Sequence, residues 1–281
     1  MDRHTADAAV IEIEGVSFAY PGREDSPALR DVSLTVGEGE FVAVVGPNGS
    51  GKSTLCRMMN ALLLPTAGRV RACGLDTSSG DDLAAIRSRV ALVMQNPDNQ
   101  IVGPTVEDDV AFGPENLALS RPEIAERVEE SLRALGLAGL RSREPHLLSE
   151  GEKKRLVLAG ALALRPRVLV SDEATSMLDP RTRLEVLLLL RRWREERKMA
   201  VVHATHHAED LLAAERVVLL SSGRKVFEGT PEEFFARGGP AEEAGMREPS
   251  LLELSRELAA RGLRVPARPL CAEEVLESLW A

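Results

Sequence analysis

The sequence predicts an α/β fold in which a mixed, mostly parallel β-sheet is covered by helices. Short apolar runs alternate with helical patterns along most of the chain, as in folds built from strand–helix–strand units. A glycine-rich loop joins one apolar run, 41–45, to a helical stretch at 53–62. Between about 105 and 165 helical patterns replace the strands, which indicates a helical subdomain inserted into the α/β domain.

Apolar runs are interpreted as two groups of strands. The first group, 11–16 and 34–36, is expected to belong to a layer rich in hairpins. The second group forms the main sheet and comprises 41–45, 90–94, 168–170, 199–203 and 217–220. Since aromatic residues make up only 3% of the chain, the core must be built from Val, Leu, Ile and Ala.

Two helix starts carry the pattern of a capping box, in which a Ser or Thr and a Glu three residues later bond each other's backbone. Ser120–Glu123 is expected to open a helix that reaches Leu135. Thr230–Glu233 repeats the pattern, with proline in the first helical position.

The C-terminal part reads as a helical extension. The stretch 238–248, rich in Gly, Ala and Glu, is interpreted as a linker. An amphipathic helix from Ser250 to Arg261 follows, with Leu251, Leu254 and Leu258 on one face, and a last helix spans 272–280. We therefore expect one domain at 1–237, with its helical subdomain at about 100–165, and an extension at 238–281.

Composition narrows the class of protein. The net charge of −9, without a dense Lys/Arg cluster interleaved with aromatics, argues against a nucleic-acid partner. The three cysteines, Cys56, Cys73 and Cys271, lack the spacing of a zinc site and favour a reducing, cytosolic setting. No run of 18 apolar residues occurs, and Met1–Thr5 lack a signal-peptide core. If the protein works at a membrane, another protein must hold it there.

The loop Gly46–Ser53 has the spacing G-x-x-x-x-G-K-[ST], which is typical of phosphate binding. Its glycines let successive backbone N–H groups turn inward, and the following helix points its positive end at the phosphates. Lys52 is expected to reach the outer phosphates and Ser53 to ligate Mg²⁺. The chain is thus predicted to bind a nucleoside triphosphate through Gly46, Asn48, Gly49, Ser50, Gly51, Lys52, Ser53 and Thr54.

The buried strand at 168–170 runs into a pair of carboxylates. Asp172 is expected to hold the metal through water, and Glu173 to polarise the attacking water. Alone, this fragment would be read as an ordinary strand with an acidic turn. Lys52 upstream makes the catalytic interpretation the better one.

The segment Leu148-Ser-Glu-Gly-Glu152 resembles the L-S-G-G-Q signature of the ATP-binding-cassette (ABC) ATPases, and the resemblance covers roughly residues 10–230. It implies that the nucleotide is ATP and that the fold is a P-loop NTPase of ABC type, with a mixed sheet core, an antiparallel β layer, an inserted helical subdomain and a short helical C-terminal extension. It implies contacts to phosphate from Ser149 and Gly151 of another subunit. The remaining roles are adenine stacking by Tyr20, sensing of metal, water and membrane partner by Gln95, a D-loop ending in Asp179, and a switch histidine, His206. For Tyr20, a strand-end aromatic remains the alternative.

Two signature positions depart from the family pattern. Glu152 replaces glutamine, and serves equally well in a capping box with Ser149. Glu150 replaces a glycine, and a unit charge about 8 Å from the γ-phosphate would cost roughly 1 kcal/mol. The helix N-terminus together with Lys153, Lys154 and Arg155 is expected to offset that repulsion.

Other candidates receive plainer interpretations. His203 is expected to be a core histidine, and Cys56 a small core residue. His146 is expected to pack or lie at the surface, and the side chain of His207 to point away from the site.

Four longer runs, 95–101, 106–113, 173–180 and 228–233, together with the tail, resemble the ATPases of energy-coupling factor (ECF) importers. The resemblance implies a second ATPase subunit, identical or related, held partly by the tail. It also implies an integral membrane coupling protein, a substrate-binding membrane protein, a position at the cytoplasmic face of the cell membrane, and uptake of a vitamin or Ni²⁺/Co²⁺. The alternatives are the ATPase of another ABC transporter and a soluble ABC-type ATPase acting on nucleic acid. The acidic residues Asp98, Glu107, Asp108 and Asp109 either receive arginines of the membrane partner or form a solvated helix start.

Overall fold

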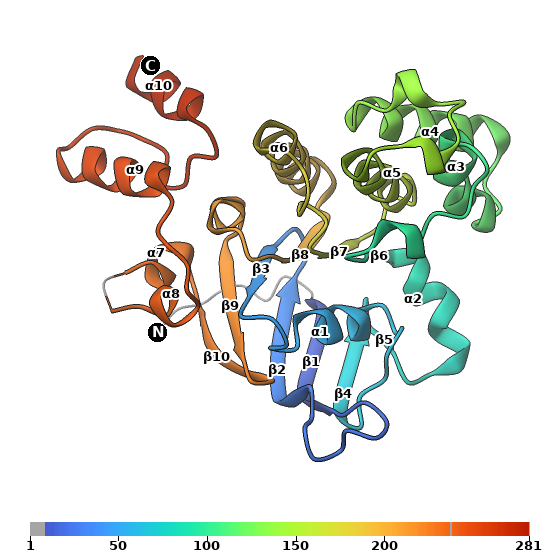
Figure 1. The fold of residues 1–281 in the computed structure, drawn as a ribbon, viewed down its shortest axis with the longest axis horizontal. Helices are drawn as coiled ribbons and strands as arrows, with labels where there is room; N and C mark the ends of the chain where they lie inside the picture. Colours follow the sequence, from blue (N-terminus) through green and yellow to red (C-terminus); the bar gives the residue numbers. More distant parts are fainter. Residues whose placement is uncertain (1–8, 237, 281) are drawn as a thin grey trace.

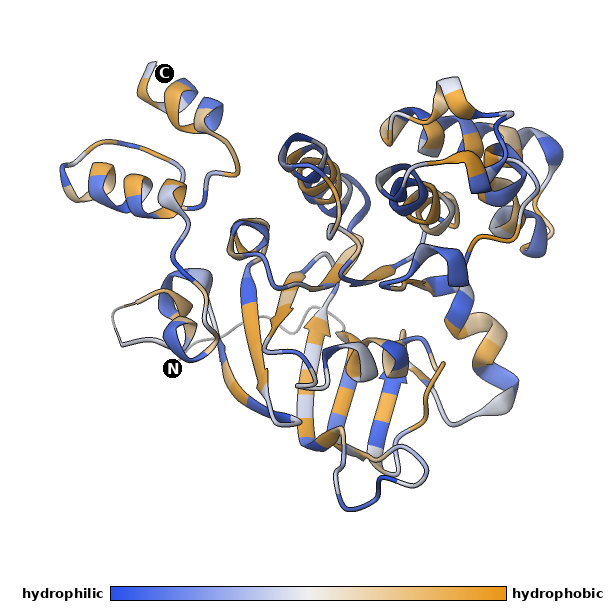
Figure 2. Cartoon of the chain, in the orientation of Figure 1, coloured by the Kyte–Doolittle hydropathy of each residue, from blue (hydrophilic) through white to orange (hydrophobic). Residues whose placement is uncertain are grey.

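The computed structural model describes residues 9–236 and 238–280, in which two sheets enclose a helix (Figure 1). The smaller sheet is antiparallel, with the order β2-β1-β4-β5. Its strands are β1 (Ala9–Phe18), β2 (Leu29–Gly37), β4 (Ala67–Ala72) and β5 (Leu75–Asp76). Polar and apolar residues alternate along them, as expected for strands with one buried face (Figure 2).

The larger sheet has the order β10-β9-β3-β8-β7-β6. All neighbours are parallel except β10, which runs antiparallel to β9 at one edge. Its strands are β3 (Phe41–Val45), β6 (Val90–Val93), β7 (Val168–Asp172), β8 (Ala200–Ala204), β9 (Arg216–Ser221) and β10 (Arg224–Gly229). All seven runs interpreted as strands lie in these two sheets, with shifts at their ends.

Both faces of the five parallel strands are buried, because each of them contributes to two cores, whereas the edge strand β10 is only partly covered. In β3, Phe41, Ala43 and Val45 pack toward the helical segments 106–134 and 150–197, whereas Val42 and Val44 pack toward helix α1 (Lys52–Met59) and the antiparallel sheet. Helix α1 contacts β4 on one side and β7 and β8 on the other. Its end, three residues earlier than predicted, is marked by Ala61, whose φ of 53° leaves the helical region.

Three mutually packed helices form the subdomain beside β6 (Figure 1). They are α3 (Val106–Asn116), α4 (Arg121–Ala134) and α5 (Glu150–Ala163). The predicted capping box at Ser120 is wrong, because the Ser120 side chain makes no capping hydrogen bond and Glu123 binds Arg127 instead. The remaining helices of the domain are α2 (Leu83–Arg89), α6 (Pro180–Arg197) and α7 (Pro231–Phe234), with 3₁₀ turns η1 (Gly80–Asp82), η2 (Pro97–Asn99), η3 (Ala138–Leu140), η4 (Pro145–Leu147) and η5 (Ala208–Ala213).

The C-terminal extension differs in two ways from the prediction. The stretch interpreted as a linker contains a helix, α8 (Pro240–Glu243), because a proline opens it and Ala241 is buried against the core. In helix α9 (Ser250–Ala260) Leu252 is the buried leucine, whereas Leu254 is 44% exposed. The predicted apolar face is therefore turned partly outward. Helix α10 (Ala272–Trp280) is tied to α6 by an ion pair between Glu274 and Arg191.

In the described parts of the chain, none of the helices combines the length and the apolar character that crossing a membrane requires. The capping box at Thr230 is present as predicted, with both of its hydrogen bonds formed. Where the chain divides into domains stays a prediction, since residue 237 lies outside the described residues.

Candidate active site

The loop Gly46–Ser53 connects β3 to α1, and two of its glycines are required by close backbone contacts. A Cβ at Gly46 would lie 2.1 Å from the carbonyl oxygen of Leu220, and one at Gly51 would lie 2.6 Å from that of Ala28. Lys52 donates from Nζ to the carbonyl oxygen of Gly46 at 2.7 Å, so its ammonium closes over the loop. The loop thus presents its amides and one buried ammonium to a common space.

Two oxygen ligands for a metal ion meet where the loop joins α1. The Ser53 hydroxyl donates to Oδ1 of Asp172 at 2.9 Å, and Asp172 ends the buried strand β7. Burial raises the pKa of the Asp172 carboxyl above its usual value, and the hydrogen bond from Ser53 offsets this rise only in part. Hydroxyl and carboxylate oxygens are hard ligands of the kind that Mg²⁺ prefers, so these residues fit that ion.

Glu173 lies beside two residues that are far from it in the sequence, Gln95 and His206. Its Oε2 accepts a hydrogen bond from Nε2 of Gln95 at 2.9 Å, and its Oε1 lies 3.5 Å from Nδ1 of His206. Glu173 has a φ of 55°, a strained value for a residue with a side chain, and such strain concentrates at functional sites. The structure therefore brings together the three residues predicted to be catalytic.

The loop, Gln95 and Glu173 line a cavity with a volume of about 490 Å³, and Tyr20 lies at the other end of it. Its phenol oxygen is 3.2 Å from Oγ1 of Thr54, and its ring packs edge-to-face on Phe18. The cavity is lined from Tyr20 and Arg23 through residues 48–54 to Gln95 and Glu173. Asn48, Gly49 and Ser50 are among its lining residues, as predicted.

The signature residues do not line this cavity. Ser149 caps α5 in a complete capping box with Glu152, whose Oε2 accepts from the backbone N–H and the hydroxyl of Ser149. Gly151 follows in the first turn of the helix. Asp179 caps α6, accepting from the N–H groups of Arg181 and Thr182.

The predicted compensation for Glu150 is correct for one of three cations. Nζ of Lys153 lies 3.3 Å from Oε1 of Glu150 and 2.8 Å from Oδ1 of Asp98, so the three side chains form one charged cluster. Lys154 is turned inward and donates to the carbonyl oxygens of Gln95 and Glu173. Arg155 donates to the carbonyl oxygen of Leu135. Lys154 and Arg155 are thus engaged elsewhere, because backbone carbonyls of neighbouring segments lie within their reach.

The acidic residues near α3 also have partners. Thr105 caps α3, accepting from the N–H of Asp108. Asp109 is buried, and its Oδ1 accepts from the N–H groups of Val102 and Gly103. Glu107 pairs with Arg141. Glu107 and Asp109 are thus engaged within the chain, whereas Asp108 is exposed.

Two contributions to the site carried no sequence signal. Lys154 is buried and its ammonium donates to the backbone carbonyl of Glu173, whereas the sequence predicted only that it would offset the charge of Glu150. Ala244, Gly245 and Met246 of the extension line a second hollow beside Asn48, Glu173 and His206. His203 and Cys56 are buried and His146 is exposed, as predicted.

Known proteins resemble this chain in sequence. The family profile described as "ABC transporter" matches residues 29–176. A protein of Symbiobacterium thermophilum named "Energy-coupling factor transporter ATP-binding protein EcfA1" is 49% identical over 276 residues, with 96% of each chain covered. A protein of the same name from Clostridioides difficile is 44% identical over 271 residues, covering 96% of this chain and 98% of that one.

Solved structures resemble it in fold. One is cbiO1 from Clostridium perfringens, described as part of the ABC transporter complex cbiONQ, with a TM-score of 0.73, 32% identity, and coverage of 88% of this chain and 99% of that one. Another is the dimeric ATP-binding cassette MJ0796 bound to ADP and Pi, with a TM-score of 0.74, 31% identity, and coverage of 79% and 98%. These likenesses confirm the predicted fold class.

Proposed function

This chain belongs to the ABC transporter family of ATP-binding proteins, and we propose that it is the ATPase subunit of an ECF importer for a vitamin or for Ni²⁺ or Co²⁺. It binds ATP, and its hydrolysis of ATP is coupled to transport. The observation that carries the proposed reaction is the position of Glu173, held between Gln95 and His206 at the mouth of the loop Gly46–Ser53.

The proposed mechanism assigns one task to each residue. The amides of the loop and Lys52 bind the phosphates of ATP, and Tyr20 stacks on adenine. Ser53, Gln95 and, through water, Asp172 would hold Mg²⁺, which when bound would neutralise charge on the outer phosphates. Glu173 accepts a proton from the attacking water. His206 orients the Glu173 carboxylate from its second oxygen and donates to the terminal phosphate.

The site is proposed to be one half of a shared site. Ser149 and Gly151 stand at the N-terminus of α5, outside the cavity that Lys52 closes. A helix N-terminus is suited to phosphate, because its first N–H groups and its dipole attract an anion. We assign these two residues, with Asp179, to the nucleotide of a second ATPase subunit, identical or related.

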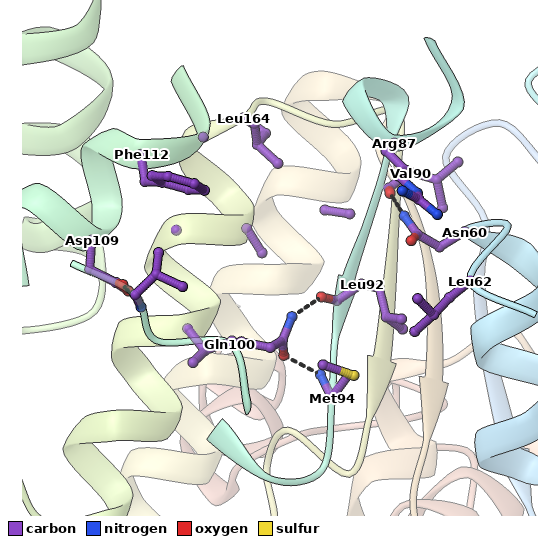
Figure 3. Close-up of a pocket in the computed structure, with 16 residues that line it drawn as sticks. Asn60, Leu62, Arg87, Val90, Leu92, Met94, Gln100, Asp109, Phe112 and Leu164 are labelled. Carbon is purple, nitrogen blue, oxygen red and sulfur yellow. Dashed lines mark hydrogen bonds between the residues drawn. The ribbon is translucent and has the colours of Figure 1, made fainter. Parts of the chain in front are cut away.

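A groove between the domain and its helical subdomain is the proposed seat of the membrane coupling protein (Figure 3). Its volume is about 370 Å³, and its lining includes Leu62, Val102 and Phe112, all large apolar residues at least 47% exposed. Gln100 lies at its floor, where its Oε1 accepts from the N–H of Met94 and its Nε2 donates to the carbonyl of Leu92 (Figure 3). Gln95 follows Met94 directly in the chain and donates to Glu173. A shift of the groove's occupant is therefore passed through Gln100, Met94 and Gln95 to Glu173.

Docking at this groove would hold the chain peripherally at the cytoplasmic face of the membrane, with a substrate-binding membrane protein in the same assembly. The net charge of −9 supports a partner other than nucleic acid.

Two substitutions test the proposed function. Glu173→Gln should lower hydrolysis about 10²–10⁴-fold while ATP still binds, and Glu209→Gln, an exposed neighbour, should not. Hydrolysis by the Glu173→Gln variant at the wild-type rate would remove Glu173 from the mechanism.

For the membrane partner, the tagged chain is purified after mild detergent extraction. Recovery with a multi-span protein and a small substrate-binding membrane protein is expected, and recovery only with DNA or ribosomes would contradict the proposal. Phe112→Glu should abolish that recovery and leave hydrolysis by the isolated chain intact. Val226→Glu, at an equally exposed apolar residue on β10, should preserve both.

A further inference from the structure

Directly beneath Glu173 and His206 lies a fully buried group of polar side chains. Its members are Ser171, Thr175, His203, Thr205 and Asp210, each no more than 1% exposed. They come from the end of β7, the loop after it, β8 with the loop that follows, and η5. We call them the Asp210 cluster. None of these five side chains has a place in the mechanism above.

The hydrogen bonds of the Asp210 cluster converge on a single oxygen. Oδ2 of Asp210 lies 2.7 Å from Oγ1 of Thr205, 2.8 Å from Oγ1 of Thr175 and 3.0 Å from Nε2 of His203. A carboxylate only accepts, so both hydroxyls and Nε2–H of His203 donate to it. Nδ1 of His203 is 3.0 Å from Oγ of Ser171, which orients the ring from its other side.

Asp210 is charged although it is buried. Burial by itself raises the pKa of the Asp210 carboxyl, but the hydrogen bonds from His203, Thr205 and Thr175 outweigh burial and hold the pKa below its usual range. A buried charge of this kind is stable only while its donors stay in place. The donors are therefore fixed by the carboxylate as much as the carboxylate is fixed by them.

Thr205 passes this order on to His206. Because its hydroxyl proton points to Asp210, its lone pairs are free to accept, and they receive the N–H of His207 at 3.1 Å. This bond from residue i+2 back to a threonine side chain closes a turn around His206. The turn sets the backbone of His206, whose Nδ1 lies 3.5 Å from Glu173.

Thr175 does the same for Glu173. It lies two residues beyond Glu173, whose backbone has the strained φ of 55°. The hydrogen bond from Thr175 to Asp210 holds the far side of this turn, and the N–H of Glu173 donates to the carbonyl of Ala204 at 3.0 Å. One carboxylate oxygen therefore anchors both segments that carry the catalytic pair.

We propose that Asp210 is a positioning residue for ATP hydrolysis: through Thr205 and Thr175 it keeps His206 and Glu173 within reach of each other. This proposal rests on the roles assigned above to Glu173 and His206. Asp210 touches neither substrate nor metal ligands in this arrangement, so it acts on the rate of the chemical step and not on nucleotide binding.

A matched pair of variants tests it. Thr205→Val keeps the shape of the side chain and removes the hydroxyl, whereas Thr205→Ser keeps the hydroxyl. We expect Thr205→Val to lower kcat at least about 10-fold, with KM for ATP changed less than about threefold, and Thr205→Ser to stay within about threefold of wild type in both. Equal kcat for the two variants would overturn the proposal.

A double-mutant cycle separates positioning from a purely structural role. Asp210→Asn should lower kcat by a clearly smaller factor in a His206→Ala background than in the wild-type chain, because only the route through Thr175 to Glu173 then remains. Effects that multiply would show that Asp210 does not act through His206. Melting temperatures identify any variant that fails to fold, in which case Thr205→Val and Thr205→Ser decide. If Glu173→Gln retained full hydrolysis, the assigned catalytic roles would fail; if it is inactive and the Thr205 pair is equal, only the role of Asp210 fails.

Discussion

Glu150→Gln should strengthen the ATP-dependent association of the two ATPase subunits. Lys153 lies between the carboxylates of Glu150 and Asp98, so this surface cluster carries a net charge of −1, and in the proposed dimer it would face the nucleotide of the second subunit. Amidation of Glu150 brings the cluster to zero. At about 8 Å and an effective dielectric constant of about 40, removing one unit charge is worth roughly 1 kcal/mol, or about fivefold in the dissociation constant for each site.

The measurement is sedimentation of the chain with its partner subunit in saturating ATP, in a Glu173→Gln background so that the nucleotide persists. Glu196→Gln, an exposed carboxylate on α6 that also has one cationic partner, is the matched control and should leave the association unchanged. The gain should shrink as salt is added, because the charges are exposed. Unchanged or weaker association of the Glu150→Gln variant at low salt would refute the reasoning.

Three further predictions concern single side chains. Tyr20→Ala should raise KM for ATP about 5–10-fold through lost stacking, with kcat nearly unchanged, and Tyr20→Phe, which loses only the contact to Thr54, should stay near wild type in a steady-state titration. Leu132→Ala, in the fully buried core of α4, should lower the free energy of unfolding by about 2–5 kcal/mol in a urea titration. Lys154→Met should lower kcat, since the carbonyls of Gln95 and Glu173 lose their donor. Burial lowers the pKa of Lys154 below 10.5, so as pH rises the folded chain releases this proton before the unfolded chain does. The wild type should therefore gain stability relative to Lys154→Met as pH approaches 10.5. Melting temperatures of both chains at successive pH values check the sign.

The loop and the strands could be predicted from the sequence because their determinants are local. Gly46 and Gly51 stand at fixed spacing beside a buried strand, and the capping boxes at Ser149 and Thr230 each depend on four consecutive residues. The same local pattern at Ser120 was misleading, because Glu123 finds a stronger partner in Arg127 one turn further on. At Ser120 the capping pattern therefore fails because an arginine binds the carboxylate that would complete the box.

The contacts of Lys154 could not be predicted from the sequence, because its partners are not local. The carbonyls that it binds lie 59 and 19 residues away in the chain, so only the fold brings them to its ammonium. Its neighbour Lys153, which is only partly buried, carries the same charge and binds carboxylates instead. A run of cations cannot reveal which member faces inward, because helical phase relative to the core decides it.

The Asp210 cluster shows why a buried charge is placed beneath a site of this kind. Apolar side chains of similar volume could pack the same loops, and they often stabilise a fold as well as a buried polar group does. They could not, however, direct the hydroxyl proton of Thr205 away from the N–H of His207, which is what leaves that hydroxyl free to accept. Hydrogen bonds fix direction as well as distance, and the pairing of Glu173 with His206 requires both. Asp210 is thus better explained by the orientation that it imposes than by any stability that it adds.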